Sequence, residues 1–402
     1  MNSSPFKCSL FWVSLVVVAA AAWLWNGNVQ RRHELRLAQQ QAVAEQSAQN
    51  AAGLLFRAFH ADHFLTYSAI SKTTARMAGK EMQTVARVVH APQRLSILYL
   101  EGDYAGLHSG HNEQWAWRQV DASQPMIPYA EMERPTSDVA ARRFALLLRN
   151  YRVVPTGQST LDGRKAEIVE LRPFEPAPGA QGPSKKLWID RETGLTLRQQ
   201  AFNYQMQPVM ESVVTQVDFS PRIDGSTFVP PRKMQEAARQ RPWVARDAGE
   251  DTMRVANMTG VYPPQVAADA LPPGFEFDSV GTHRCETHGT PSGAACYAAL
   301  TRYSDGLNAL TVFAMKSGCA AGEAIFKNSP NNSPAANKNA DKNSAQQQNT
   351  DSMPACDYGP GTLVMRDAGN GQLIAVADLP APVLRRVLEA ASVRLYSASK
   401  KP

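Results

Sequence analysis

The sequence predicts an α+β protein in which an antiparallel sheet curls around helices and a smaller mixed unit follows it. Short extended segments separated by turn residues recur between about residues 86 and 217, and two helical patterns accompany them. A proline- and charge-rich stretch from 230 to about 250 then precedes a second set of strand patterns. The length of 402 residues fits two or three domains, and 44% apolar residues exclude a wholly disordered chain.

The N-terminus carries a targeting pattern. Lys7 precedes an uncharged, mostly apolar run over residues 9–25. Such a run is typical of a signal peptide, and its length also reaches the lower limit of about 17 residues for a membrane anchor. We therefore expect residues 1–30 to be either a cleaved signal peptide or a retained anchor, with the body of the protein outside the cytosol.

Cysteine usage supports an oxidising compartment. Apart from Cys8, which precedes the apolar run, the four cysteines all lie in the last third, at Cys285, Cys296, Cys319 and Cys356. None has the C-x-x-C spacing that would favour zinc, so disulfides are the better interpretation. We expect Cys285 to pair with Cys296 and Cys319 with Cys356, because each pair would close one local loop, although the sequence leaves the other pairings open.

The first half of the chain predicts the elements of the larger sheet. Residues 31–62 are rich in Ala, Gln and Leu and predict a helix that leads into the sheet, which we assign to residues 63–229. A second helix should begin at Thr136–Asp138 and end before Pro155. Strands are expected at 86–90, 95–100, 114–118, 166–171, 186–190, 195–198 and 212–217. Gly194 in the loop 191–194 should adopt a positive φ.

The second half predicts a linker and a smaller unit. We assign residues 230–268 to the linker and 269–397 to the unit, with a closing helix over 381–395. Strands are expected at 296–300, 309–313, 361–366 and 373–377, with a hairpin turn at Asn370–Gly371. Residues 328–354 contain no Leu, Ile, Val or aromatic residue, which predicts a disordered insertion.

The sequence carries no convincing catalytic or cofactor motif. It has neither a P-loop nor a dinucleotide-binding glycine pattern, and the pair His60 and His63 lacks the spacing of a zinc-binding helix. We therefore expect no catalysis, metal or cofactor. The net charge of +6 is spread over a long chain, which argues against nucleic acid as a partner. Trp115 and Trp117 would share one face of a strand, where they either pack in a core or line an apolar ligand site.

Several segments resemble a known family. Residues 151–154, 161–166 and the run Leu-Trp-Ile-Asp-Arg-Glu-Thr-Gly-Leu at 187–195 are similar to the N-terminal domain of the MucB/RseB family, periplasmic regulators of the envelope-stress sigma factor. That run is shared in outline with the LolA/LolB lipoprotein carriers. Residues 271–275, 303–313 and 378–387 are similar to the C-terminal domain of MucB/RseB proteins, which the carriers lack.

The resemblance implies a fold and a function. The expected fold is an open antiparallel β-barrel of the LolA/LolB type wrapped on helices, plus a small mixed α/β C-terminal domain. The expected function is a periplasmic regulator that binds the periplasmic part of a transmembrane anti-sigma factor and responds to lipid or lipopolysaccharide-like signals. A LolA-like lipoprotein or lipid carrier is the alternative. The protein would be soluble after cleavage or tethered to the inner membrane by residues 9–25, and self-association is left open.

The resemblance also suggests functional residues. Lipid contacts are expected at Trp115, Trp117 and Trp188. Contacts with the protein partner are expected at Tyr303, Asp305, Arg385 and Arg386.

Overall fold

The computed structural model describes residues 49–77, 80–112, 116–118, 127–128, 137–175, 184–229, 250–285, 296–316, 355–358 and 361–396. The chain divides into two units, residues 1–53 and 54–402. In the first unit, residues 49–53 are described, and they are helical. No helix in the described ranges is both long enough and apolar enough to cross a membrane. The predicted apolar run 9–25 and the predicted insertion 328–354 lie outside the described residues.

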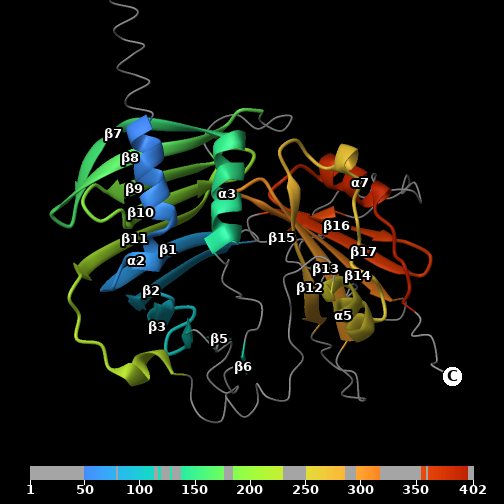
Figure 1. The fold of residues 1–402 in the computed structure, drawn as a ribbon, viewed down its shortest axis with the longest axis horizontal. Coiled ribbons are helices and arrows are strands. Elements are labelled where there is room, and N and C mark those ends of the chain that lie inside the picture. The colour runs from blue at the N-terminus through green and yellow to red at the C-terminus, as the bar shows by residue number, and fades with distance from the viewer. Residues whose placement is uncertain are drawn as a thin grey trace, which may run out of the picture. The chain divides into compact units, whose positions relative to one another are not determined.

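The larger sheet has eleven antiparallel strands in the order β6-β5-β4-β3-β2-β1-β11-β10-β9-β8-β7 (Figure 1). In chain order these strands are β1 (Tyr67–Met77), β2 (Lys80–Ala91), β3 (Arg94–Gly102), β4 (His108–His111), β5 (Ala116–Arg118), β6 (Ile127–Pro128), β7 (Tyr151–Leu161), β8 (Arg164–Pro173), β9 (Lys185–Asp190), β10 (Thr196–Phe202) and β11 (Pro208–Asp218). The order is linear, because β6 and β7 at its two ends do not pair with each other. The barrel expectation is therefore corrected to an open, curled sheet.

The strand β7 lies at one edge of this sheet and contains a proline. The helix α3 (Ser137–Asn150) ends before Pro155, as predicted, but the chain turns directly into β7, which the sequence did not predict. Pro155 lies inside this strand, and the register with β8 shifts between Pro155 and Gly157. An edge position tolerates both features, because the missing N–H of proline then faces no neighbouring strand.

The hairpin between β9 and β10 follows its prediction. The backbone N–H of Gly194 donates to the carbonyl of Asp190 at 2.9 Å, and the φ of Gly194 is +83°. A Cβ at this position would lie 3.0 Å from the Cβ of Arg57. Glycine is needed both for the left-handed backbone and for this close approach.

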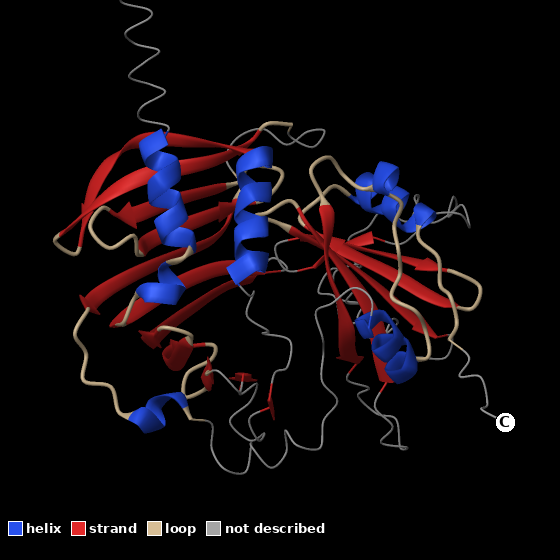
Figure 2. Cartoon of the chain, viewed as in Figure 1, coloured by secondary structure: helices blue, strands red, loops and turns tan. Residues whose placement is uncertain are grey.

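Helices cover part of one face of the larger sheet (Figure 2). Residues 54–59 are helical, the short α2 follows at Ala61–Phe64, and α3 lies beside them. The ring of Phe144 on α3 lies 5.2 Å from that of Phe56 and 5.5 Å from that of Phe59. Leu55 on the first helix and Leu147 on α3 are almost fully buried. The predicted apolar face of the first helix therefore packs against the rest of the fold.

The smaller sheet has six strands in the order β12-β13-β14-β17-β16-β15. They are β12 (Glu276–Cys285), β13 (Cys296–Ser304), β14 (Ala309–Lys316), β15 (Ala355–Tyr358), β16 (Gly361–Asp367) and β17 (Gly371–Ala377). In the described part of the chain, the helices α5 (Glu250–Thr259) and α7 (Ala381–Ala390) accompany the sheet, with 3-10 turns at Gly225–Phe228 and Ala268–Ala270 before it. The strands β12 and β15 and the helix α5 have no counterpart in the sequence predictions.

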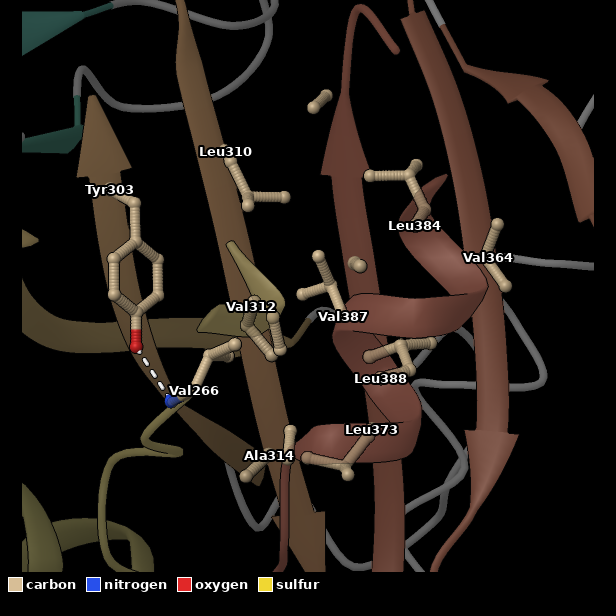
Figure 3. Packing of buried hydrophobic residues seen from close by; sticks show 14 of the residues in the cluster. Val266, Tyr303, Leu310, Val312, Ala314, Val364, Leu373, Leu384, Val387 and Leu388 are labelled. Carbon is tan, nitrogen blue, oxygen red and sulfur yellow. Dashed lines mark hydrogen bonds between the residues drawn. The ribbon is translucent and has the colours of Figure 1, made fainter. Parts of the chain in front are cut away.

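The core of the smaller sheet follows the two-residue period of its strands. Leu310, Val312 and Ala314 alternate along β14 and face Leu384 and Leu388 of α7 (Figure 3). The helix α7 is shorter than the predicted 381–395 and ends at Ala390. Arg366 donates to the carbonyl of Ala391 at 2.7 Å and so satisfies one of the acceptors that the helix end leaves unpaired.

The turn between β16 and β17 lies one residue earlier than predicted. The N–H of Ala368 donates to the carbonyl of Gly371 at 2.8 Å, so Gly369 and Asn370 form the turn and Gly371 begins β17. A Cβ on Gly371 would lie within 3.0 Å of the carbonyl oxygen of Met315. Gly371 therefore serves close strand packing, and Gly369, with a φ of +60°, serves the turn.

The backbone register bears on the cysteines. Cys285 and Cys296 are direct partners at the end of the β12–β13 ladder, whereas Cys356 lies on β15 and Cys319 lies outside the described residues. Direct partners on antiparallel strands are close enough for a disulfide. The pairing itself stays a prediction.

We expect Cys285→Ser to lower the free energy of unfolding by ~2–3 kcal/mol under oxidising conditions, because a disulfide restrains the unfolded chain. Urea unfolding with and without reductant would measure the effect, and Cys8→Ser is the matched control with no expected change. Identical unfolding of the unmodified protein in both conditions would contradict the pairing.

Candidate functional site

The middle of α3 contacts β12 through a bidentate ion pair. Arg143 donates from Nε to Oδ1 of Asp278 at 2.7 Å and from Nη2 to Oδ2 at 2.6 Å. The side chain of Asp278 is only 3% exposed, and Arg302 lies 3.9 Å away. Burial alone would raise the pKa of Asp278, but the hydrogen bonds and charge of Arg143 outweigh burial and hold this pKa below its ordinary value. The carboxylate therefore stays ionised at neutral pH.

A second polar contact lies where α3 ends and β7 begins. The hydroxyl of Tyr151 donates to Oδ2 of Asp305 at 2.5 Å, and Nδ2 of Asn308 donates to the Tyr151 oxygen at 2.7 Å. The other carboxylate oxygen of Asp305 accepts from the backbone N–H groups of Leu307 and Asn308 at 2.8 and 2.6 Å. Burial, with the charge of Asp305, raises the pKa of Tyr151, so the phenol stays protonated and keeps donating.

Further contacts with the end of α3 come from the turn after β13 and from Gly274, which precedes β12. Asn150 donates from Nδ2 to the carbonyls of Gly274 and Asp305, both at 2.9 Å. Gly306 has a φ of +94°, and a Cβ there would lie within 3.0 Å of the backbone nitrogen of Leu147. Only glycine fits the turn and the close approach at once.

We expect Gly306→Ala to cost ~1–3 kcal/mol from backbone strain, and more from the clash with Leu147. Thermal unfolding would measure the loss. Gly369→Ala is the control, because its φ is also positive but no atom lies within 4 Å of the added Cβ. Equal losses for the two variants would show that the clash with Leu147 contributes nothing.

Charges of opposite sign meet at these contacts. Arg149 on α3 pairs with Glu276 at the start of β12, and both side chains are exposed. Burial lowers the pKa of Lys185 at the start of β9, and the charge of Asp305 partly offsets that effect. Arg143, Arg149 and Lys185 come from α3 or β9, Arg302 comes from β13, and the facing carboxylates come from β12 or the turn after β13.

A further contact involves Asp378, which follows β17. Its Oδ1 accepts from the backbone N–H of Tyr204 at 3.3 Å. Burial raises the pKa of Asp378 from 3.8 to about 6, although the hydrogen bond from Tyr204 acts in the opposite direction. The ionised carboxylate is therefore less stable in the folded chain than in the unfolded chain.

We expect Asp378→Asn to raise the free energy of unfolding by ~1–3 kcal/mol above pH 6, because the amide keeps an acceptor oxygen without the cost of a buried charge. In the unmodified protein the folded state binds the extra proton between pH 3.8 and about 6, so stability falls as pH rises through this window. The gain should vanish below pH 4. Urea unfolding across pH 3.5–7.5 measures it, and a gain independent of pH would contradict the assignment to Asp378.

The predicted partner residues fall into two groups. Tyr303 is buried, and its hydroxyl accepts from the N–H of Val266 at 2.9 Å (Figure 3), while Asp305 is buried in the contacts above. Both side chains are thus engaged inside the chain. Arg385 and Arg386 lie on α7, where Arg386 is exposed. For a protein partner, the structure therefore leaves Arg386 available on the surface.

The predicted lipid residues are only partly described. Trp188 on β9 is 6% exposed, with the guanidinium of Arg198 4.4 Å from the ring centroid and the ammonium of Lys186 5.4 Å from it. Trp117 lies on β5, but its side chain is outside the described residues, as is Trp115. Trp188 is thus buried in a hydrophobic cluster of the larger sheet with two cations near its ring, and its contact with lipid stays a prediction.

The chemistry of the site is that of a non-covalent contact. The carboxylates of Asp278 and Asp305 are committed to hydrogen bonds inside the chain. In the described part of the chain, no group of three or more His, Cys, Asp or Glu side chains could hold a metal ion. The sequence reasoning missed Arg143 and Asp278, which are separated by 135 residues. Tyr151 was within its reach, because it begins one of the segments that carry the family resemblance.

Comparisons place these observations among known proteins. Residues 50–232 match the MucB/RseB N-terminal domain family. The chain is similar to the solved MucA/MucB complex of Pseudomonas aeruginosa at 17% identity, over 87% of this chain and 99% of that chain, with a TM-score of 0.52. It is also similar to MucB in complex with MucA(peri), at 18% identity, 87% and 100% coverage and a TM-score of 0.49. A LolA superfamily protein from Nitrosomonas europaea is similar at 12% identity, 45% and 96% coverage and a TM-score of 0.22. No curated protein sequence matches the chain.

Proposed function

Because residues 50–232 belong to the MucB/RseB N-terminal domain family, we propose that this protein is a non-enzymatic periplasmic regulator that binds the periplasmic part of a transmembrane anti-sigma factor. Through that partner it modulates transcription by the sigma factor. The observation that carries the proposal is the second, six-stranded sheet, which follows the family domain. The fold similarity to the MucA/MucB structure extends over 87% of the chain, well beyond residues 50–232.

The proposed contact surface includes α7. Arg386 is exposed on this helix, while Leu384 and Leu388 on its other side are buried in the core (Figure 3). An amphipathic helix with a fixed inner face presents its outer cations in a defined position. A cation in that position favours an acidic or carbonyl-rich segment of the partner.

Release by lipid-like signals is the second part of the proposal. It rests on the family resemblance and on the predicted lining residues Trp115 and Trp117. Trp188 is the third predicted lining residue, and its buried ring lies near the cations of Arg198 and Lys186. A lipid carrier of the LolA type is the competing function.

Capture from living cells tests the proposal. The tagged, full-length chain is cross-linked mildly in vivo, and both the proteins and the lipids retained are identified by mass spectrometry. Recovery of a single-pass membrane protein with an anti-sigma cytosolic domain supports the regulator. Recovery of lipoproteins or lipids without such a protein contradicts it and favours the carrier.

A matched pair of variants then tests the surface on α7. Arg386→Glu should lower the affinity for the captured partner by about tenfold or more, whereas Arg87→Glu, an exposed position on β2, should leave it unchanged. Equal affinities for the two variants would show that α7 is not the contact surface.

A further inference from the structure

The contacts between α3 and the smaller sheet form a distinct group, which we call the α3 clasp. It comprises Arg143, Asn150 and Tyr151 on one side and Asp278, Asp305 and Asn308 on the other. All six side chains contribute polar atoms to these contacts, and Tyr151 adds a buried ring. Contact surfaces of this kind, unlike hydrophobic ones, allow the parts of a chain to move relative to each other.

The apolar cores lie elsewhere. The described hydrophobic clusters each belong to one sheet: one is built around Leu197 and Trp188 in the larger sheet, and two around β14 and β17 in the smaller sheet. No residue of the clasp belongs to any of these three clusters. Opening the clasp would therefore leave these cores intact.

The energetics of the clasp favour reversible opening. Buried ion pairs lose hydration when they form, so their net contribution is small compared with their direct attraction. When the clasp opens, Arg143 and Asp278 regain hydration, and so do Tyr151 and Asp305. Apolar side chains gain no such favourable hydration when a core is exposed to water.

We infer that the α3 clasp opens as a unit while both sheets remain folded, so that the chain has a closed and an open state. A ligand or partner that binds one of these states more tightly would shift the equilibrium between them. The inference concerns the chain alone and does not depend on the proposed partner.

Hydrogen exchange of the full-length protein tests this inference. The amides of Leu307 and Asn308 donate to Asp305, whose other carboxylate oxygen accepts from Tyr151 in the clasp, so exchange at this turn should rise when the clasp opens. Amides of β14 report on the core of the smaller sheet. In native-state exchange with increasing urea, the turn amides should open with a shallower urea dependence than those of β14, because less surface is exposed.

A conservative variant localises the effect. Tyr151→Phe keeps the buried ring but removes the hydroxyl that donates to Asp305, and exchange at residues 304–308 should become about tenfold faster while β14 stays unchanged. Tyr303→Phe is the matched control. It also removes one buried hydroxyl, but that hydroxyl accepts from the N–H of Val266 and makes no contact with the clasp. The exchange rate of residues 304–308 should therefore stay unchanged.

Two outcomes would overturn the inference. If the turn and β14 exchange with the same urea dependence, the clasp opens only when the sheet unfolds. If Tyr151→Phe and Tyr303→Phe accelerate the turn equally, the hydroxyl of Tyr151 has no specific part in closing the clasp. The urea series uses the unmodified protein and so decides the first point even where a variant fails to fold.

Discussion

Replacing Asp190 by alanine is expected to lower the free energy of unfolding by ~3–5 kcal/mol, because it leaves a partly buried guanidinium without its carboxylate. Arg164 donates from Nε to Oδ2 of Asp190, whose side chain is 2% exposed. The other oxygen of Asp190 accepts from the backbone N–H of Glu192 at 2.9 Å and so also fixes the loop between β9 and β10. Urea unfolding at pH 7 would measure the loss.

The same arginine supplies the control. Arg164 also contacts Glu192 at 3.4 Å, but the side chain of Glu192 is 85% exposed. Ion pairs at such exposed positions contribute ~1 kcal/mol or less, so Glu192→Ala should be nearly neutral. A loss for Glu192→Ala as large as that for Asp190→Ala would show that burial does not set the strength of these contacts.

Replacing Leu384 by alanine is expected to cost ~2–5 kcal/mol. Leu384 is fully buried on the inner face of α7, where it packs with Val387 and Leu388 against the smaller sheet (Figure 3). Deleting its branched end removes buried apolar surface and leaves a cavity that the surrounding strands fill only in part. Circular dichroism during urea unfolding would follow the loss.

Leu395→Ala is the matched control for this substitution. The side chain of Leu395 is 48% exposed, so the same chemical change should shift the free energy of unfolding by ~0.5 kcal/mol or less. Equal losses at the two positions would contradict the placement of α7 against the sheet.

The hairpins and the core of the smaller sheet could be predicted because their signals are local. The alternation of Leu310, Val312 and Ala314 marks the buried face of β14, and Gly194 marks a turn that requires a positive φ. These patterns depend on side-chain direction and backbone sterics within a few residues. No distant part of the chain is needed to read them.

The strand β1 and the α3 clasp could not be predicted because their signals are not local. The strand β1 is rich in Ser and Thr, and its place in the sheet depends on pairing with β2 and with β11, which is about 140 residues away in the chain. Asp305 stood out in the sequence, but its burial depends on Tyr151, which is 154 residues earlier. Nothing near either residue indicates that contact.

Among the strands that the structure describes, the open sheet leaves β7 without a neighbour on one side, and such an edge can template the addition of a strand from another molecule. Pro155 offers no N–H to an incoming strand, and the bulge before Gly157 breaks the spacing of the remaining donors and acceptors. Thr156, Gln158 and Thr160 add an exposed polar surface. Growth of fibrils or chains of molecules from this edge is thereby disfavoured, and the protein can keep a sheet that does not close without the aggregation that an unprotected edge would invite.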